Sequence, residues 1–263
     1  MKYTLSNGKQ VEQKRSKTIF IVLAVIAMSW ISVVMTDFSF KVLFERGKRF
    51  FDILISMWPP DIGYLKFIWT PLFDTIKMSL LGSAIGSLCA IPFAILASSN
   101  IIHNKIIISI IRLFLSLVRT FPTLVVALIA TYIVGLGTLA GTIAIAVFTF
   151  AYVGKILYEQ IETVDMGPYE AIESFGATKL MAFTAGILPQ ILPSYIANCL
   201  FCFEGNVRYA ALLGYVGAGG LGLILNEKVS WREYQSVGMI LVALFISVMI
   251  IEAISHYLRK KLT

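Results

Sequence analysis

The stretch Glu170–Leu180, EAIESFGATKL, is the most unusual part of this sequence. Two glutamates, a serine, a threonine and a lysine surround one glycine, although the flanking segments are apolar enough for a lipid bilayer. The run ILPQILP follows shortly after it and carries Pro189 and Pro193. Because charged side chains are costly inside lipid, the stretch predicts a surface helix that leads into a membrane helix.

The composition places the chain in the membrane class. Of its 263 residues, 58% are hydrophobic and only 14% are charged, whereas about a quarter of the residues in soluble domains are charged. The net charge of +7 does not indicate nucleic-acid binding, because the basic residues lie at the ends of apolar runs and no basic patch interleaved with aromatic residues is present.

The apolar runs predict an all-α integral membrane protein with six transmembrane helices. They cover residues 18–36, 75–98, 105–134, 138–158, 193–213 and 237–257. The third run is too long for a perpendicular span, so we expect it to tilt and to bend at Pro122. In the second run, Gly82, Gly86 and Pro92 favour close contacts between helices.

The remaining segments complete the predicted organisation. Residues 1–17 and 259–263 form basic tails, residues 37–74 form an external amphipathic helix and loop, and residues 75–258 form the core domain. Apolar residues between Phe40 and Trp58 recur at three- and four-residue spacing, which predicts a helix in the outer lipid interface that ends before Pro59 and Pro60. The basic tails predict that both termini lie in the cytoplasm.

The polar stretch carries the signals of two short helices. Asp165 can cap the first helix, and Pro168 suits its first position. The pattern predicts a helix over 169–175, a break at Gly176, and a second helix that starts at Ala177.

This constellation is similar to the EAA signature of ABC importer permeases. Glu170, Ala171, Gly176, Leu188 and Pro189 match the signature, and Ile172 stands where many members carry a second alanine. The resemblance implies that the coupling helices, at about 165–184, dock into a groove on a cytoplasmic ATPase subunit. The candidate coupling residues are Glu170, Ala171, Glu173, Ser174, Gly176 and Ala177.

The stretch Phe203–Gly222, FEGNVRYAALLGYVGAGGLG, is the next informative one. Gly217, Gly219 and Gly222 have the spacing of a dinucleotide fingerprint, but they follow a membrane span, and an apolar residue, Ile240, lies near where an acidic residue would be required. We therefore expect these glycines to let the backbone bend and pack tightly. Glu204 and Arg208 lie one turn apart in a span, and they either neutralise each other or line a pathway.

The same stretch resembles the phosphonate importer permeases, as does GKILYEQIETVDMGPYEAIESFGAT at residues 154–178. The resemblance covers the chain from about Asp74 onward. It implies a type I ABC importer permease fold in the bacterial cytoplasmic membrane, and a pathway for phosphonate, phosphite, a phosphate ester or phosphate. The candidate pathway residues are Arg208, Glu204, Asn206, Arg119, Gly217 and Gly219.

The resemblance also implies the partners. These are a dimeric ABC ATPase that binds ATP and Mg, a second permease copy that is identical or paralogous, an extracytoplasmic substrate-binding protein, and membrane lipid. The chain itself is expected to bind no cofactor or metal and to perform no covalent chemistry. Cys199 and Cys202 have a metal-ligand spacing, but they lie in an apolar segment and are expected to pack there.

Three alternatives remain open from the sequence. The substrate of such a permease could be methionine or another small solute, because related permeases share both motifs. An ion-coupled transporter would leave the polar surface helix unexplained. A membrane-embedded enzyme would require a catalytic cluster, and the sequence offers no His-Asp, Ser-Lys or metal-ligand set.

Overall fold

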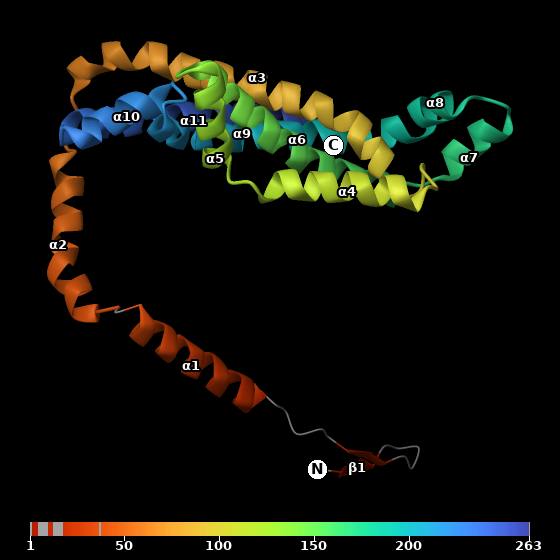
Figure 1. The fold of residues 1–263 in the computed structure, drawn as a ribbon, viewed down its shortest axis with the longest axis horizontal. Helices are drawn as coiled ribbons and strands as arrows, with labels where there is room; N and C mark the ends of the chain where they lie inside the picture. The colour runs from red at the N-terminus through yellow and green to blue at the C-terminus, as the bar shows by residue number, and fades with distance from the viewer. Residues whose placement is uncertain (1, 5–9, 13–17, 37, 263) are drawn as a thin grey trace. The chain divides into compact units, whose positions relative to one another are not determined.

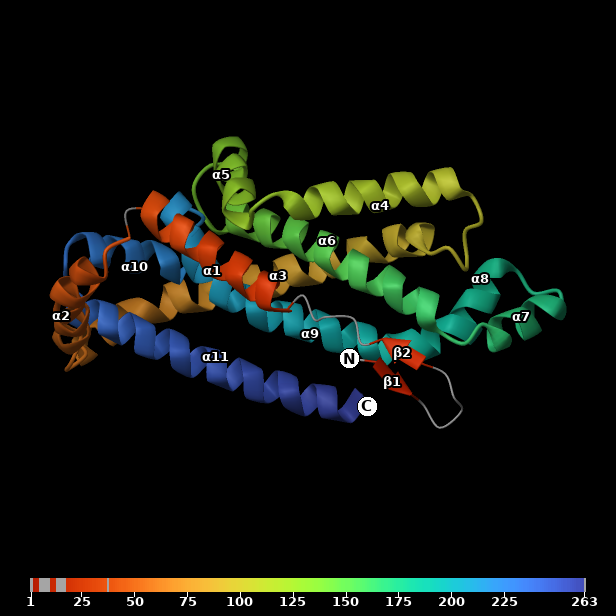
Figure 2. The same ribbon diagram turned by 90° about the horizontal axis from the view of Figure 1, so that it is seen from below.

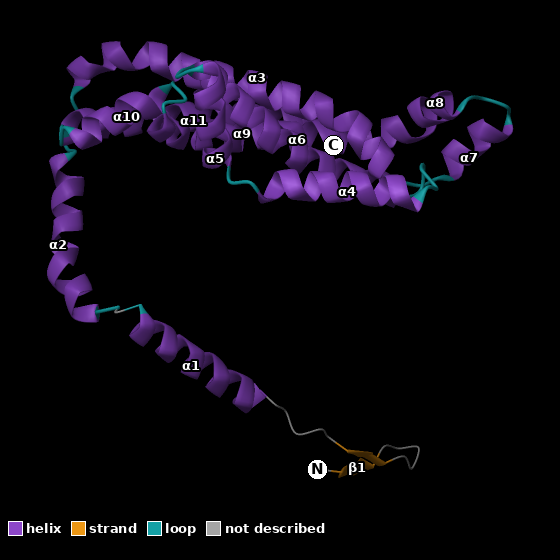
Figure 3. Cartoon of the chain, viewed as in Figure 1, coloured by secondary structure: helices purple, strands orange, loops and turns teal. Residues whose placement is uncertain are grey.

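The computed structural model describes residues 2–4, 10–12, 18–36 and 38–262. The chain divides into two compact units, Met1–Ile55 and Ser56–Thr263, and each is considered by itself. Apart from one short hairpin, the described elements are helical (Figure 3).

The first unit contains a hairpin and two helices. Strands β1 (Lys2–Thr4) and β2 (Gln10–Glu12) pair antiparallel, with Tyr3 opposite Val11, a feature that the sequence analysis did not predict. Helix α1 (Thr18–Met35) contains no charged residue and buries none of its side chains within the chain, as expected for a helix that faces lipid. Helix α2 (Phe40–Ser56) confirms the predicted amphipathic helix.

The second unit is a bundle built around four long helices. These are α3 (Leu65–Ala97, preceded by the short turn η1, Ile62–Tyr64), α6 (Thr138–Thr163), α9 (Leu188–Leu213) and α11 (Tyr234–Leu262). Figure 2 shows them running side by side. The most extensive packing joins α3 to α6, where a Cβ atom at Gly82 would lie 2.8 Å from the carbonyl oxygen of Thr142, and one at Gly86 would overlap the carbonyl oxygen of Ala146. The prediction that these glycines bring helices together is confirmed.

The third predicted span is broken rather than gently bent. Helices α4 (Lys105–Thr120) and α5 (Thr123–Val134) meet at an angle of 86°. Phe121 adopts an extended conformation, with ψ of 124°, because Pro122 disfavours the helical region for the residue before it and cannot donate a backbone hydrogen bond. The bend expected at Pro122 is therefore present, but it is a complete break that divides the run into two helices.

The two ends of the bundle differ. One end, which we call the α7 end, carries α7 (Gly167–Ser174), α8 (Lys179–Ala182) and the π-helical turn η2 (Phe183–Ile187). The other end, the α10 end, carries η3 (Gly214–Val216) and α10 (Leu221–Ser230). Figure 1 shows α7 and α8 projecting at the right and α10 lying at the left.

Several helices continue beyond the predicted apolar runs. Helix α3 begins at Leu65 rather than Thr75, α6 ends at Thr163 rather than Tyr158, and α9 begins at Leu188 rather than Pro193. Among the described residues, five helices are long and apolar enough to cross a membrane, or six if α4 and α5 together count as one span. This agrees with the predicted all-α membrane fold.

Candidate functional site

Helix α7 is tied to the first turn of α9 by hydrogen bonds. The N-cap of α7 is Met166 rather than the predicted Asp165, whose Oδ1 accepts from the backbone N–H of Gly167 at 2.9 Å from one residue earlier, and Pro168 lies in the first turn. Gln190 of α9 accepts from the Asp165 backbone N–H at 3.2 Å and donates to the carbonyl oxygens of Asp165 at 3.0 Å and Gly186 at 2.7 Å. The loop before α7 and the start of α9 are therefore fixed to each other.

A second connection is made by close packing. Tyr169 is the buried residue of α7. It packs in an apolar cluster whose other buried members are Ala94, Leu157, Ile161, Ala182, Phe183, Ile187 and Ile191. A Cβ atom at Gly186 would lie 2.9 Å from both the backbone nitrogen and the Cα atom of Tyr169. Burial raises the pKa of the Tyr169 hydroxyl, and the nearby Glu173 carboxylate adds to the effect.

The opposite face of α7 is open. Glu170, Ala171, Glu173, Ser174 and Gly176 are all exposed, whereas Ala177 is half-buried. Gly176 has φ of +85°, and a Cβ atom there would meet no atom within 4 Å. The structure therefore brings five of the six predicted coupling residues onto one accessible surface.

Sequence reasoning missed the apolar residues of this surface. Phe175 is 90% exposed, Leu180 is 72% exposed and Met181 is 61% exposed. Large apolar side chains around a polar helix are typical of an interaction site. The signal in the sequence that could have indicated this surface is Phe175, an aromatic residue directly before Gly176.

The predicted pathway residues Glu204 and Arg208 belong to a larger ion-pair network. Arg208 Nη2 contacts Glu204 Oε1 on α9, and it also lies 3.6 Å from Glu252 Oε2 on α11. Arg259 Nη2 of α11 lies 3.5 Å from Glu204 Oε2. The Glu204 side chain is only 8% exposed, whereas that of Arg208 is 52% exposed. The network thus links α9 to α11 and brings two arginines to two glutamates.

Asn206 has a bridging position inside the bundle. Its side chain is buried and donates to Ser83 Oγ of α3 and to Thr149 Oγ1 of α6, both at 2.8 Å. One amide group on α9 thus joins three helices. Such a fully paired amide specifies the register of the helices.

Gly217 and Gly219 lie at the α10 end, both with φ of +76°. The Gly137 backbone N–H donates to the Gly217 carbonyl oxygen at 3.0 Å, and a Cβ atom at Gly219 would lie 2.9 Å from the Thr138 nitrogen. These contacts confirm the expected bending and tight packing, because a larger residue would push this turn away from the start of α6.

Arg119 lies away from the other candidates, in the last turn of α4, where it lines a hollow of about 320 Å³ against α6. Arg208, by contrast, faces α11 through its ion pair with Glu252. Figure 2 shows α4 and α11 at opposite edges of the bundle. The structure therefore does not bring Arg119 and Arg208 into one site.

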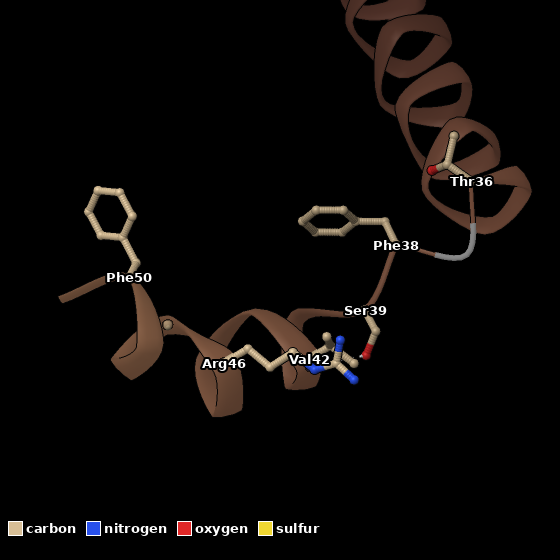
Figure 4. A pocket seen from close by; sticks show the side chains of 7 residues that line it. Thr36, Phe38, Ser39, Val42, Arg46 and Phe50 are labelled. Atoms are coloured by element: carbon tan, nitrogen blue, oxygen red, sulfur yellow. Dashed lines mark hydrogen bonds between the residues drawn. The ribbon is translucent and has the colours of Figure 1, made fainter. Parts of the chain in front are cut away.

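Two other features bear on possible ligand sites. A hollow of about 590 Å³ lies beside the bend between α1 and α2, where Phe38, Arg46 and Phe50 line it (Figure 4), but these side chains are exposed, and the described residues leave the hollow open. In the described part of the chain, no group of three His, Cys, Asp or Glu side chains is placed to hold a metal ion. Cys202 packs against Ala90 and Val153, with Cys199 beside them.

Comparison with known proteins shows consistent similarities. Residues 90–263 match the family described as "Binding-protein-dependent transport system inner membrane component". The putative phosphite transport system permease protein HtxC of Stutzerimonas stutzeri is 31% identical over 258 residues, which cover 97% of this chain and 90% of that protein. The phosphite transport system permease protein PtxC of the same organism is 34% identical over 203 residues, which cover 77% of this chain and 74% of that protein.

A solved structure shares the fold. The MetNI methionine ABC transporter, in an inward-facing conformation, includes a chain that matches with a TM-score of 0.69 and 21% sequence identity. The match covers 77% of this chain and 99% of that chain.

Proposed function

Because the chain belongs to the family of binding-protein-dependent transport system inner membrane components, as a permease of the phosphonate type, we propose that it forms the membrane pathway of an importer for a phosphorus oxyanion. Phosphite, phosphonate, phosphate esters and phosphate are the substrates of this class. The observation that carries the substrate proposal is the identity of 31% along 97% of the chain with a protein named for phosphite transport.

The import is driven by a partner ATPase dimer that binds α7. In support of this, α7 exposes Glu170, Phe175 and Gly176 while Tyr169 and Gly186 hold its other face against the bundle. ATP and Mg bind to the ATPase, and this chain supplies no cofactor site. Because the contact between α7 and α9 is rigid, a displacement of α7 by the ATPase shifts α9 and switches the bundle between inward- and outward-facing packings.

The remaining parts of the assembly follow from the same proposal. Two permease copies, identical or paralogous, enclose the pathway, and an extracytoplasmic binding protein delivers the anion at the α10 end. The α7 end then faces the cytoplasm together with both termini. The last turn of α11 supports this orientation, because it carries Arg259, Lys260 and Lys261, and basic residues flank spans on the cytoplasmic side.

Uptake measurements test this proposal. Cells that lack their own phosphite uptake, and that express this chain with the ATPase and the binding protein of a phosphite importer, are supplied with labelled phosphite. We expect unlabelled phosphite or methylphosphonate to compete and methionine not to compete. Uptake of labelled methionine without any uptake of labelled phosphite would overturn the substrate and support the alternative of a methionine permease, and phosphite uptake that survives ATP depletion would support an ion-coupled transporter.

A further inference from the structure

The hollow between α4 and α6 has an unusual lining. Its polar side chains are those of Arg112, Ser116, Arg119, Lys155 and Tyr158. The three cations are Arg112 and Arg119 of α4 and Lys155 of α6. The two helices meet where the buried Leu115 packs against Gly154, because a Cβ atom at Gly154 would lie 3.2 Å from the Leu115 side chain. The close packing below the hollow therefore fixes the distance between the cations on α4 and the cation on α6.

Arg112 is held in place by several interactions within the fold. Its Nε donates to the Ala97 carbonyl oxygen at 2.9 Å, its Nη2 pairs with Glu162 Oε1, and its guanidinium lies 4.7 Å from the centre of the Tyr158 ring. Glu162 also accepts from the backbone N–H of Ser99 at 2.8 Å. Arg112 thus joins the link before α4 to the end of α6, and its charge is balanced by Glu162.

Lys155 and Arg119 make fewer interactions with the rest of the described chain than Arg112 does. Lys155 Nζ lies 3.3 Å from Glu159 Oε1, an exposed pair one turn apart on α6, and such pairs contribute little stability in water. Among the residues that the structure describes, Arg119 has no carboxylate within ion-pair distance, and its side chain is exposed at the rim of the hollow. Two of the three cations pair with a carboxylate, Arg112 with Glu162 and Lys155 with Glu159, and neither glutamate is among the residues that line the hollow.

We propose that this hollow binds a phosphate-type oxyanion through Arg119, Lys155 and the Ser116 hydroxyl. Tetrahedral oxyanions suit this lining, because their several oxygens accept simultaneously from a guanidinium fork, an ammonium and a hydroxyl. The volume of about 320 Å³ accommodates a small phosphorus group. The Arg208 network is less suited to bind an anion, because its two arginines, Arg208 and Arg259, already pair with two carboxylates.

The phosphorus group can come from two sources with the same chemistry. Lys155 lies about two helical turns before the end of α6 at Thr163, on the side of the bundle that faces the cytoplasm if the proposed function holds. At that depth the hollow is reached either by the transported anion as it leaves the pathway or by the headgroup of an anionic phospholipid in the cytoplasmic leaflet.

Binding measurements on the full-length chain distinguish the two sources. The permease is purified and inserted into nanodiscs of phosphatidylcholine, and binding of methylphosphonate and inorganic phosphate is followed by calorimetry. In a second arm, retention of phosphatidylglycerol is measured by native mass spectrometry. The variants are Arg119→Gln and Lys155→Gln, and Lys105→Gln, an exposed residue in the first turn of α4 outside the hollow, is the control.

We expect Arg119→Gln to weaken binding by about tenfold or more in one of the two arms, since it removes a charge-assisted contact, while Lys105→Gln leaves binding unchanged. Loss in the first arm identifies the soluble anion, and loss in the second identifies the lipid. Absence of binding in both arms, or binding that Arg119→Gln and Lys155→Gln leave unchanged, overturns the site. Phosphite uptake by the wild-type chain is scored separately, so the site and the proposed function can fail independently.

Discussion

Gly186 lies directly against Tyr169, so that a Cβ atom at Gly186 would come within 2.9 Å of the Tyr169 backbone nitrogen and Cα atom. Gly186 belongs to the π-helical turn before α9, and Tyr169 is the buried residue of α7. This backbone contact joins α7 to the turn that leads into α9.

Gly186→Ala should therefore disturb transport. The added methyl group overlaps backbone that can only shift, with a strain of about 1–3 kcal/mol, and we expect phosphite uptake to fall while the amount of permease in the membrane is unchanged. Gly205→Ala on α9 is the matched control, because a Cβ atom at Gly205 meets no atom within 4 Å. Equal uptake by the two variants would show that the contact does not transmit motion.

Phe175→Ala should weaken the association with the ATPase without destabilising the permease. Phe175 is 90% exposed, so its removal costs the fold little, whereas an aromatic anchor in an interface contributes about 2 kcal/mol or more. The measurement is the amount of ATPase that copurifies with the tagged permease. Trp231→Ala, which truncates an aromatic side chain that is 73% exposed at the α10 end, should leave copurification unchanged.

Glu204→Ala should destabilise the bundle more than Arg208→Ala does. The Glu204 side chain is 8% exposed and meets both Arg208 and Arg259, so its loss removes the shared carboxylate from both arginines, of which Arg208 keeps Glu252, at a cost of about 1–3 kcal/mol. Arg208 is half-exposed, and after its removal Glu204 keeps Arg259. Thermal unfolding in detergent checks the order.

The same variants decide between the two roles of Arg208. A purely structural pair predicts that uptake by Arg208→Ala falls only in proportion to the lost stability. A much larger fall in uptake, with the protein still folded, would instead place Arg208 in the pathway.

Asn206→Leu should lower the stability of the bundle by about 1–3 kcal/mol, because the amide donates to Ser83 and Thr149 from a buried position. Asn226→Leu, at a half-buried position on α10, provides the same change of residue type outside this network. If both variants unfold at the same temperature, the three-helix bridge contributes no net stability.

The local features of the fold were predictable from the sequence. Hydrophobic runs located the spans, and Asp165, Pro168 and Gly176 located the start and the end of α7, because caps and helix breaks act over a few residues. The break at Pro122 was less predictable, since Pro92 and Pro193 lie inside continuous helices. A proline permits a break, and the packing around it decides whether the helix continues.

Contacts between distant segments were not predictable. Arg259 was taken only as part of a basic tail, yet it reaches Glu204 across the interface of α9 and α11. Arg112 likewise finds Glu162 at the far end of α6. A single sequence gives the residues that can pair, and the bundle decides which of them meet.

The conformation of Gly176 has a consequence for the choice of subunits. Among the described residues, apart from its two neighbours in the chain, none has an atom within 4 Å of the position that a Cβ atom would occupy there, so within the described fold the main restriction on this residue is the positive φ. Any further restriction on size comes from the protein that covers it. In a cell that makes several related ATPases, the exposed face of α7 would then be the recognition surface that selects one of them. Exchanging this short segment between two permeases should exchange the ATPase subunits that they bind.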